Sequence, residues 1–318
     1  MGDPAGVGPE VCLHALASAE VASLCTPIVF GDAAVLRACA ERTKLPAPAR
    51  IIADADIGSC TQPAVLDLGA IALEAFTPGA INAATGRAGC AYVHRAIDAA
   101  LAGHVAAVTT APLNKEAMSM AGIKFPGHTE IFAARTNAAR TCMMQYSEEI
   151  TCTFVTVHVG YAEVPALLTR ERILDVIELT AEGLARIRGR KPKLAVLGLN
   201  PHAGEHGLFG DREEERIIIP AIEEARARGH DIEGPLPPDT AFLPWKRRST
   251  DAFVCMYHDQ GHIPVKALAF DSAVNTTLGL PIIRTSVDHG TALDIAWQGT
   301  ARPDSLFAAV RLAVRLGV

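Results

Sequence analysis

Short apolar runs, rich in valine, isoleucine and phenylalanine, alternate along the chain with longer stretches in which apolar residues recur at helical spacing. The short runs predict strands over residues 27–30, 105–109, 141–146, 151–158, 194–199, 253–257 and 282–286. The longer stretches predict helices over residues 9–22, 33–41, 89–102, 170–188, 213–228 and 305–316. This alternation is typical of an α/β fold in which helices pack on a largely parallel sheet.

Composition indicates a folded chain and excludes several classes of protein. Hydrophobic residues make up 49% of the 318 residues and charged residues 20%, a balance that excludes disorder as the main state. The net charge of −6 provides no general positive field, so we expect neither nucleic acid nor a membrane surface as partner. No apolar stretch approaches the roughly 18 residues of a membrane span, and the first residues lack the pattern of a signal peptide.

The eight cysteines predict free thiols. No two of them have the Cys-x-x-Cys spacing of zinc fingers or thioredoxin-like sites, and a chain of 318 residues does not need disulfide bonds for stability. This cysteine usage indicates a cytoplasmic protein.

Three histidines, His158, His202 and His258, each follow an apolar run that predicts a strand. The carboxyl ends of strands in α/β folds meet at the edge where ligands bind, so three imidazoles there could converge on one divalent metal ion. One such histidine alone is more often a structural residue, but the repeated placement favours a metal site. The sequence has no His-Glu-x-x-His motif and so gives no support for a metalloprotease.

Three further segments predict contacts to ligands. Backbone amides at a helix start in Gly-His-Thr at 127–129 would suit phosphate or carboxylate, although Thr129 taken alone is better explained as a helix cap. Arg284 falls at a strand end, where its guanidinium can bind an oxyanion with two hydrogen bonds. The loop His-Gly-Thr-Ala at 289–292 is small enough for a flat ligand to approach its backbone closely.

These segments together resemble the 4-hydroxythreonine-4-phosphate dehydrogenase family. The matching motifs are Gly-Asp-Pro-Ala-Gly-Val-Gly-Pro-Glu at 2–10, Gly-His-Thr-Glu at 127–130, Leu-Asn-Pro-His-Ala-Gly-Glu at 199–205, Pro-Asp-Thr at 238–240, Tyr-His-Asp-Gln-Gly at 257–261 and the segment 274–294. They occur in order from the first residues to near the end, so the resemblance covers essentially the whole chain.

The resemblance implies the two-domain fold of the isocitrate and isopropylmalate dehydrogenases, with the active site in the cleft between the domains. We expect a discontinuous first α/β domain of residues 1–120 and 290–318. The second α/β domain, residues 121–289, is expected to carry most metal and substrate residues and the dimer contact. The implied assembly is a homodimer with the active site near the subunit interface and metal ligands drawn from both subunits.

The family's functional residues map onto matching positions of this chain. The resemblance implies one divalent metal ion per site on His158, His202 and His258, and an all-imidazole set favours zinc or cobalt and holds magnesium more weakly. The implied substrate contacts are His128, Thr129, Lys266, Asn275 and Arg284. The expected catalytic base is Lys266 or Asp239. The segment that would receive the adenosine part of NAD or NADP comprises His289, Gly290, Thr291, Ala292 and Asp294.

The sequence departs from the family pattern at three places. Family members usually have a short apolar strand before the Gly-Asp-Pro motif, whereas Met1 directly precedes it, so we expect a missing edge strand or a late start. Trp297 stands where glycine is usual, which is expected to alter cofactor affinity or the choice between NAD and NADP. The motifs His-Gly-Leu-Phe-Gly at 206–210 and Gly-His-Ile-Pro-Val-Lys at 261–266 resemble a paralogous branch associated with threonate or erythronate 4-phosphates.

We therefore expect an NAD(P)-dependent, metal-dependent oxidative decarboxylation of a small 4-phosphorylated 3-hydroxy acid. The substrate would be 4-hydroxy-L-threonine 4-phosphate, as in pyridoxine biosynthesis, or a four-carbon analogue such as D-threonate 4-phosphate. Two alternatives stay open. A dihydrodiol dehydrogenase of aromatic-acid degradation has no phosphate to bind, so the pair His128 and Thr129 argues against it. A non-catalytic ligand-binding paralogue would not need the full set of histidines and Lys266.

Overall fold

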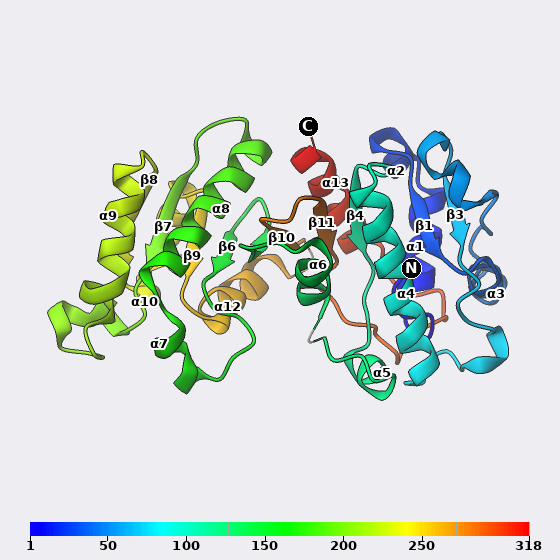
Figure 1. Ribbon diagram of the computed structural model, residues 1–318, viewed down its shortest axis with the longest axis horizontal. Coiled ribbons are helices and arrows are strands. Elements are labelled where there is room, and N and C mark those ends of the chain that lie inside the picture. The colour runs from blue at the N-terminus through cyan, green and yellow to red at the C-terminus, as the bar shows by residue number, and fades with distance from the viewer. Residues whose placement is uncertain (126, 271, 318) are drawn as a thin grey trace. The chain divides into compact units, whose positions relative to one another are not determined.

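The chain, in a computed structural model that describes residues 1–125, 127–270 and 272–317, divides into two compact units (Figure 1). Unit 1 consists of Met1–Ala138 and Leu280–Gly317, and unit 2 of Ala139–Gly279. The sequence placed the two boundaries after residues 120 and 289, whereas this division places them after residues 138 and 279. Within the described residues, no helix combines the length and apolar character that a membrane crossing requires.

Unit 1 contains two sets of parallel strands covered by helices. Its strands are β1 (Ile28–Gly31), β2 (Ile51–Ile52), β3 (Ala64–Asp67), β4 (Ala107–Thr110) and β11 (Ile283–Ser286). Its helices are α1 (Gly8–Ala17), α2 (Ala19–Leu24), α3 (Ala33–Thr43), α4 (Ala83–Leu101), α5 (Lys115–Met120), α6 (His128–Thr136) and α13 (Asp304–Gly317), with the 3₁₀ turns η1 (Asp54–Ser59) and η2 (Leu73–Ala75). Strand β3 lies between β1 and β2, and β4 pairs with β11. Helix α6 contacts α4, and α13 packs on β4 and β11.

Unit 2 is built around one mixed sheet. Its strands are β5 (Cys142–Tyr146), β6 (Thr151–Phe154), β7 (Lys193–Leu197), β8 (Asp231–Leu236), β9 (Ala252–Cys255) and β10 (Val274–Leu278). Its helical segments are η3 (Tyr161–Glu163), α7 (Val164–Leu167), α8 (Arg170–Arg188), η4 (Pro201–Gly207), the π-helical turn η5 (Glu214–Ile218), α9 (Ile219–Ala227), α10 (Pro238–Ala241), α11 (Pro244–Arg248) and α12 (His258–Ala269). The strand order is β10-β5-β6-β9-β7-β8. Strand β5 is antiparallel to both β10 and β6, whereas the pairs β6-β9, β9-β7 and β7-β8 are parallel. Helix α8 packs on β5, β6, β9 and β10, whereas α12 contacts β6 and β9.

Apolar side chains from these elements form separate cores in the two units. In unit 1, Leu13 and Leu36 belong to a cluster between α1 and α3, and Ile97 and Phe132 to a second cluster between α4 and α6. In unit 2, Phe253 belongs to a cluster of side chains from the sheet and α12. The burial of such side chains is the main favourable contribution to folding.

The predicted strands and helices are all present, but several of their boundaries are wrong; helix α4, for example, begins at Ala83 and not at residue 89. The predicted helix 9–22 is interrupted at Ser18, whose extended backbone and side-chain oxygen cap a new helix by accepting from the amide of Val21 at 3.2 Å. The predicted strand 151–158 ends at Phe154, so His158 lies in the following loop. The predicted helix 213–228 begins with the π-helical turn η5. All eight cysteines are free thiols, as predicted.

Candidate active site

A buried arginine and the start of a helix form a polar cluster in unit 1. Arg284 on β11 is only 2% exposed, and its Nη2 donates to Thr110 Oγ1 on the neighbouring strand β4 at 3.2 Å. Its guanidinium carbon lies 5.6 Å from the ring centroid of Phe132 on α6. His128 is the first residue of α6, after the N-cap residue Gly127. The cluster thus combines a fixed cation with the amides of a first helical turn, a combination that suits an anion.

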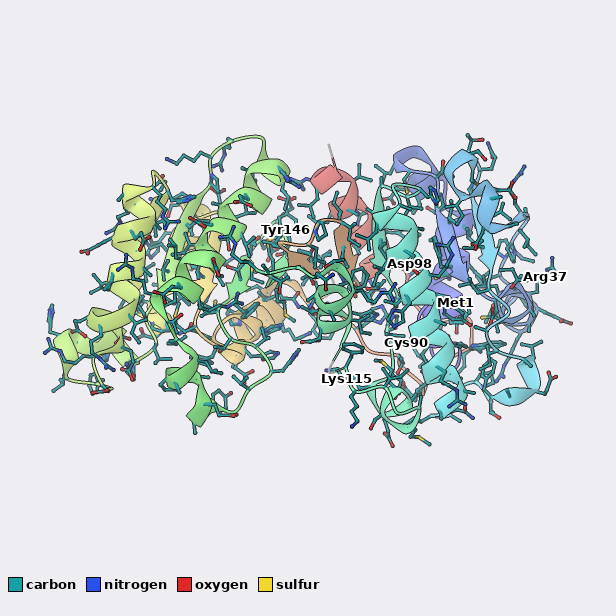
Figure 2. The ribbon with its side chains drawn as sticks, in the orientation of Figure 1. Met1, Arg37, Cys90, Asp98, Lys115 and Tyr146 are labelled. Carbon is teal, nitrogen blue, oxygen red and sulfur yellow. The ribbon has the colours of Figure 1, made fainter. Side chains whose placement is uncertain are left out.

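Burial and positive charge set the ionisation of this cluster. Burial lowers the pKa of His128 well below its ordinary value of 6.5, and the cations of Arg284 and Lys115 lower it further. Figure 2 labels Lys115 at the start of α5. Burial also lowers the pKa of Arg284 to about 9 against the opposing effect of Glu130, so the guanidinium keeps its charge at neutral pH. The Nε2 atom of His128 is buried and has no hydrogen-bond partner within the described residues, which leaves it available to a ligand.

The structure corrects one interpretation of Thr129. Gly127 occupies the N-cap position of α6 and no side chain caps this helix end, whereas Thr129 is the second residue inside the helix. A cap residue has to precede the helix, since its side chain accepts from amides of the first turn. The interpretation of Thr129 as a helix cap is therefore wrong.

Two of the three predicted metal ligands lie close together in unit 2. His158 lies in the loop after β6, and His258 is the first residue of α12. Their ring centroids are 5.7 Å apart. Two imidazoles on one tetrahedral ion, with metal–nitrogen bonds of about 2 Å, would have ring centroids about 5 Å apart. The spacing of this pair is therefore compatible with a shared metal ion.

Neighbouring side chains fix the ring of His258. Its Nδ1 lies 2.6 Å from Asp259 Oδ1, and the Tyr161 hydroxyl donates to Asp259 Oδ2 at 2.5 Å. The His262 ring stacks on the His258 ring with 3.7 Å between centroids, and it also stacks on Phe154. The hydrogen bonds from Tyr161 and His258 hold the pKa of Asp259 below its ordinary range. Tyr161 was not singled out from the sequence, because 98 residues separate it from Asp259 and only the fold brings them together.

The third predicted ligand, His202, lies in the left-handed segment η4. Positive φ angles occur at His202 (52°), Ala203 (52°), Glu205 (44°) and His206 (58°). The expected tight loop is therefore present, and it is not a right-handed helix. Each non-glycine residue in this conformation costs roughly 1–2 kcal/mol, so the segment needs compensating contacts.

A buried glutamate supplies such contacts to the start of this segment. Glu214 Oε1 accepts from the amides of Leu199 and Asn200 at 2.9 and 2.8 Å, and Glu214 Oε2 accepts from the side-chain amide of Asn200 at 3.0 Å. A Cβ atom at Gly204 would lie 2.6 Å from Glu214 Oε2, so this glycine allows the carboxylate its position. Glu214 thereby fixes the loop that carries His202.

The described residues of one chain do not form a complete metal site. Across residues 1–125, 127–270 and 272–317, no three histidine, cysteine, aspartate or glutamate side chains come close enough to hold one ion. The structure thus brings His158 and His258 together but does not group His202 with them. Grouping of all three stays a prediction, as does the sharing of ligands between subunits.

The other predicted residues of unit 2 lie on separate elements. Lys266 is an exposed residue of α12, about two turns after His258, and its Nζ lies 5.4 Å from the ring centroid of Phe270. Asp239 is exposed in α10, and Asn275 lies on β10 opposite β5. Helix α12 therefore carries both a metal-ligand candidate and a base candidate.

The predicted cofactor segment is tied to the first residues of unit 1. The carbonyl oxygen of Thr291 accepts from the amide of Val7 at 2.9 Å, and a Cβ at Gly6 would lie 2.7 Å from that oxygen. The Nε2 atom of His289 is buried and has no partner among the residues described. A Cβ at Gly290 would meet no atom within 4 Å. This open space beside a fixed backbone suits a flat ligand.

The end of the same segment is anchored in the core of unit 1. Ala292 and Trp297 have left-handed φ angles of 42° and 60°, and Asp294 is exposed. The Trp297 side chain is buried, its Nε1 donates to the Pro4 carbonyl at 3.0 Å, and its ring centroid lies 6.0 Å from that of Phe76. The left-handed backbone at position 297 favours glycine and makes tryptophan conformationally unfavourable there. The contacts of the buried indole offset this unfavourable backbone energy. An effect of Trp297 on the cofactor stays a prediction.

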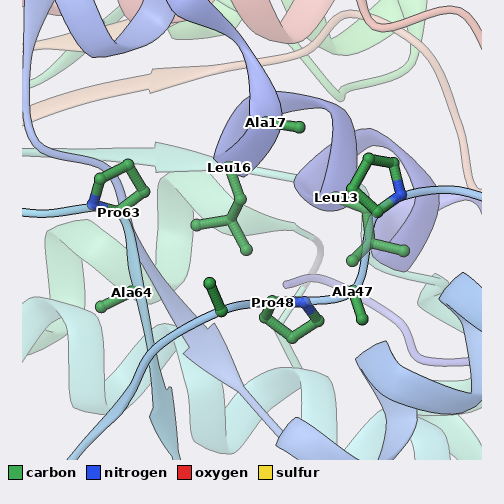
Figure 3. Close-up of a pocket in the computed structure, with 9 residues that line it drawn as sticks. Leu13, Leu16, Ala17, Ala47, Pro48, Pro63 and Ala64 are labelled. Carbon is green, nitrogen blue, oxygen red and sulfur yellow. The ribbon is translucent and has the colours of Figure 1, made fainter.

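A cavity of about 190 Å³ in unit 1 has a different chemical character (Figure 3). The lining residues are Leu13, Leu16, Ala17, Pro46, Ala47, Pro48, Ala49, Pro63 and Ala64. These leucine, alanine and proline side chains offer no charge to a phosphate or carboxylate. The cavity therefore does not suit the expected substrate.

The chain is similar to characterised families of proteins along almost its whole length. The family model described as pyridoxal phosphate biosynthetic protein PdxA matches residues 23–313. The chain is 48% identical to the 4-hydroxythreonine-4-phosphate dehydrogenase of Desulfosudis oleivorans, over 99% of this chain and 94% of that protein. It is 42% identical to the D-threonate 4-phosphate dehydrogenase of Pectobacterium atrosepticum, over 99% and 97% of the two chains. The crystal structure of 4-hydroxythreonine-4-phosphate dehydrogenase from Klebsiella pneumoniae matches with a TM-score of 0.87 at 40% identity, over 100% of this chain and 98% of that one.

Proposed function

The chain belongs to the family of the pyridoxal phosphate biosynthetic protein PdxA and is an oxidoreductase similar to 4-hydroxythreonine-4-phosphate dehydrogenase, and from this premise we propose its reaction. The reaction is the NAD(P)-dependent oxidative decarboxylation of 4-hydroxy-L-threonine 4-phosphate or of D-threonate 4-phosphate. The observation that carries the proposal is the buried cationic cluster of unit 1, with Arg284 and His128 at the start of α6. A phosphate ester is the substrate feature that this cluster recognises.

The phosphate group fits the cluster for electrostatic reasons. The Arg284 guanidinium is held by Thr110 and by the ring of Phe132, so its orientation is fixed before a ligand arrives. His128 is neutral at physiological pH because its pKa is low, and it can donate a hydrogen bond without adding to the buried charge. The first turn of α6, including Thr129, supplies further donors to a phosphate.

The chemical steps follow from the substrate and from the residues of unit 2. Lys266 or Asp239 takes the proton of the 3-hydroxyl group, while hydride leaves C3 for the nicotinamide ring of NAD or NADP. The resulting 3-keto acid loses CO2, and the electron pair of the broken carbon–carbon bond becomes an enolate that is then protonated. Asn275 binds the substrate and helps to hold it for these steps. A divalent ion, when bound, supplies Lewis acidity that lowers the pKa of a hydroxyl group and stabilises enolate charge.

The imidazole donors fit a divalent metal ion. The ring spacing of His158 and His258 is compatible with one ion, and the hydrogen bond between His258 Nδ1 and Asp259 leaves Nε2 as the nitrogen that could bind it. His202 of the partner subunit completes the set. Three imidazoles favour zinc or cobalt over magnesium.

The same arrangement requires a homodimer. Unit 2 exposes several large apolar side chains, namely Leu208, Phe209, Trp245, Ile263 and Phe270. Burial of such side chains against a second copy would be favourable at about 25 cal/mol per Å² of apolar surface. The first two follow the loop that carries His202, and the last two lie on or next to α12. A dimer through these residues would bring His202 of one chain toward His258 of the other.

The segment at 289–294 is proposed to bind the adenosine part of the cofactor. Its backbone is fixed by Val7, it has open space beside Gly290, and the buried Nε2 of His289 can pair with a ligand. The exposed carboxylate of Asp294 is available to a ribose hydroxyl, a contact that favours NAD over NADP.

The phosphate anchor is tested by Arg284→Met, which keeps the volume of the buried side chain but removes its charge. Loss of hydrogen bonds to a charged group costs about 1.5–3 kcal/mol each, so KM for a 4-phosphorylated substrate should rise by about tenfold to several hundredfold. Arg311→Met, at an exposed arginine of α13 paired with Glu20, is the matched control and should leave KM unchanged. An equal KM in wild type and Arg284→Met, measured by initial rates of NADH formation, would contradict the proposal.

A further inference from the structure

A line of hydrogen bonds leads from the surface of unit 2 to the ring of His258. The Tyr161 hydroxyl donates to Asp259 Oδ2 at 2.5 Å, and Asp259 Oδ1 lies 2.6 Å from His258 Nδ1. Tyr161 begins the turn η3 after the loop of His158, whereas Asp259 is in the first turn of α12. The carboxylate therefore links the segment of one metal-ligand candidate to the ring of the other.

The plane of the His258 ring is fixed independently of these hydrogen bonds. The ring of His262 lies parallel to it, with 8° between the planes and 3.7 Å between the centroids. The ring of His262 also stacks on Phe154 at 4.3 Å, and its Nδ1 lies 3.0 Å from the His258 carbonyl oxygen. Stacking sets the plane of the ring and Asp259 marks the side on which Nδ1 lies, so the remaining variable is which ring nitrogen carries the proton.

We propose that Asp259 and Tyr161 are positioning residues that hold His258 as the tautomer with hydrogen on Nδ1 and the lone pair on Nε2. This inference rests on the proposed metal site, because a metal-binding histidine needs its lone pair on the nitrogen that binds the ion. Asp259 accepts from Nδ1–H through Oδ1. The hydroxyl of Tyr161 occupies Oδ2 and keeps the carboxylate turned toward the ring.

A role in folding does not account for this arrangement. Tyr161 is 66% exposed, and exposed polar contacts of this kind contribute little to the stability of a folded chain. Outer-sphere carboxylates that orient a metal-binding histidine, in contrast, typically change metal affinity by 10–100-fold when they are removed. A structural role and a positioning role therefore predict different results for stability and for metal affinity.

The tautomer can be measured without any metal. In the full-length, metal-free protein labelled with ¹⁵N in its histidines, two-bond ¹H–¹⁵N correlation spectra at pH 8 distinguish Nδ1–H from Nε2–H rings, and His258→Ala assigns the signal. We expect His258 in the wild type to be the Nδ1–H tautomer. In Asp259→Ala we expect the signal to move toward the Nε2–H form that free imidazole side chains prefer. An Nε2–H ring in the wild type would overturn the inference.

Metal affinity gives the second measurement. Titration of the metal-free protein with Co²⁺, followed by its visible absorption, should show about 10–100-fold weaker binding in Asp259→Ala. Tyr161→Phe removes one hydrogen bond and should weaken binding by about threefold to tenfold. The matched control is Tyr257→Phe, because the Tyr257 ring contacts the Tyr161 ring edge-on at 5.8 Å without being the donor to Asp259. It should bind Co²⁺ like the wild type.

The outcomes separate this inference from the proposed function. If the wild type binds Co²⁺ and His258→Ala does not, the metal site stands, and unchanged affinity in both Asp259→Ala and Tyr161→Phe would overturn only the positioning role. If the wild-type protein binds neither Co²⁺ nor Zn²⁺, in any oligomeric state, the proposed metal site is wrong, and the positioning role is then wrong as well. A thermal unfolding midpoint within about 2 °C of the wild-type midpoint, for each metal-free variant, would show that weaker binding is not caused by unfolding.

Discussion

At the scale of single residues, burial determines the hydrogen bonding and ionisation of Arg284 and His128 in unit 1. Arg284 is buried, donates a hydrogen bond to Thr110 and lies over the ring of Phe132, and His128 has a buried nitrogen that no described residue satisfies. Burying a polar atom without a partner is unfavourable, and a phosphate oxygen would give the His128 nitrogen a partner. The proposed function gives these residues a role in binding the substrate phosphate, which their burial without a structural partner for His128 supports.

The low pKa of His128 predicts how stability depends on pH. Burial and the Arg284 cation keep the folded-state pKa well below 6.5, so as pH falls below about 6.5 the unfolded chain binds a proton that the folded chain does not. This stability is fully present above pH 6.5 and is lost as the pH falls toward the folded-state pKa, by up to about 1.4 kcal/mol per pH unit. In His128→Gln, the free energy of unfolding from urea titrations between pH 5 and 8 should therefore depend less steeply on pH. If the free energy of unfolding has the same pH dependence in the wild type and in His128→Gln, the low pKa of His128 does not explain it.

At the scale of secondary-structure elements, the β-branched runs and long amphipathic stretches could be predicted because their signal is local. Helix α12 could not be predicted from the sequence, because it contains Gly261 and Pro264, which are more typical of loops. It forms because the glycine allows close packing: a Cβ at Gly261 would lie 2.7 Å from the ring of Phe154 and 2.8 Å from Cys255 Sγ. Strand β10 was missed because its central residues are polar, and pairing with β5 determines it instead.

The candidate site shows the same division between local and long-range information. The residue types at positions 158, 258 and 284 could be selected from motifs, since histidine and arginine after apolar runs are informative in an α/β fold. The partners that orient them, Thr110 for Arg284 and Tyr161 for Asp259, could not, because each contact joins distant parts of the sequence. Orientation depends on tertiary structure, whereas ligand chemistry is visible in the residue type.

The loop of His202 offers a test at this scale. In Glu214→Gln, one carboxylate oxygen is replaced by an amide nitrogen that faces the side-chain nitrogen of Asn200, so at least one hydrogen bond of this buried group is lost. We expect a loss of about 1–3 kcal/mol in the free energy of unfolding, measured in urea, and weaker metal binding because the left-handed segment relaxes. The exposed neighbour Glu223→Gln is the control and should change neither quantity. Unchanged stability in Glu214→Gln would show that the carboxylate does not fix the loop.

At the scale of the whole molecule, the two units carry different candidate site residues. Unit 1 contains the cationic cluster of Arg284 and His128 and the candidate cofactor segment. Unit 2 contains the three candidate metal-binding histidines, Lys266, Asp239 and Asn275. The α/β class is present, as predicted, although the sheet of unit 2 is mixed because β5 is antiparallel to its neighbours. The kinship with isocitrate and isopropylmalate dehydrogenases and the active site in a cleft between the domains stay predictions.

Sharing of the metal ligands between two copies predicts complementation between inactive variants. His202→Ala and His258→Ala should each be inactive alone, but a heterodimer formed by subunit exchange would keep His158 and His258 on one chain and His202 on the other. Mixing them should restore up to one working site per heterodimer. His158→Ala mixed with His258→Ala is the matched control, because every site then lacks a ligand, and no activity should return. Restored activity in the control, or none in the test mixture, would argue against sharing between subunits.

The central claim is that this chain oxidises a phosphorylated hydroxy acid with a metal ion and a nicotinamide cofactor. The most direct measurement is the rate of NADH or NADPH formation with 4-hydroxy-L-threonine 4-phosphate, D-threonate 4-phosphate and unphosphorylated D-threonate, before and after treatment with a chelator. We predict turnover with at least one phosphorylated acid, release of CO2 equal to the NADH or NADPH formed, and a much lower kcat/KM for the unphosphorylated acid. Chelation should abolish the activity, and zinc or cobalt should restore it. No cofactor reduction with either phosphorylated acid, or full activity after complete metal removal, would contradict the account.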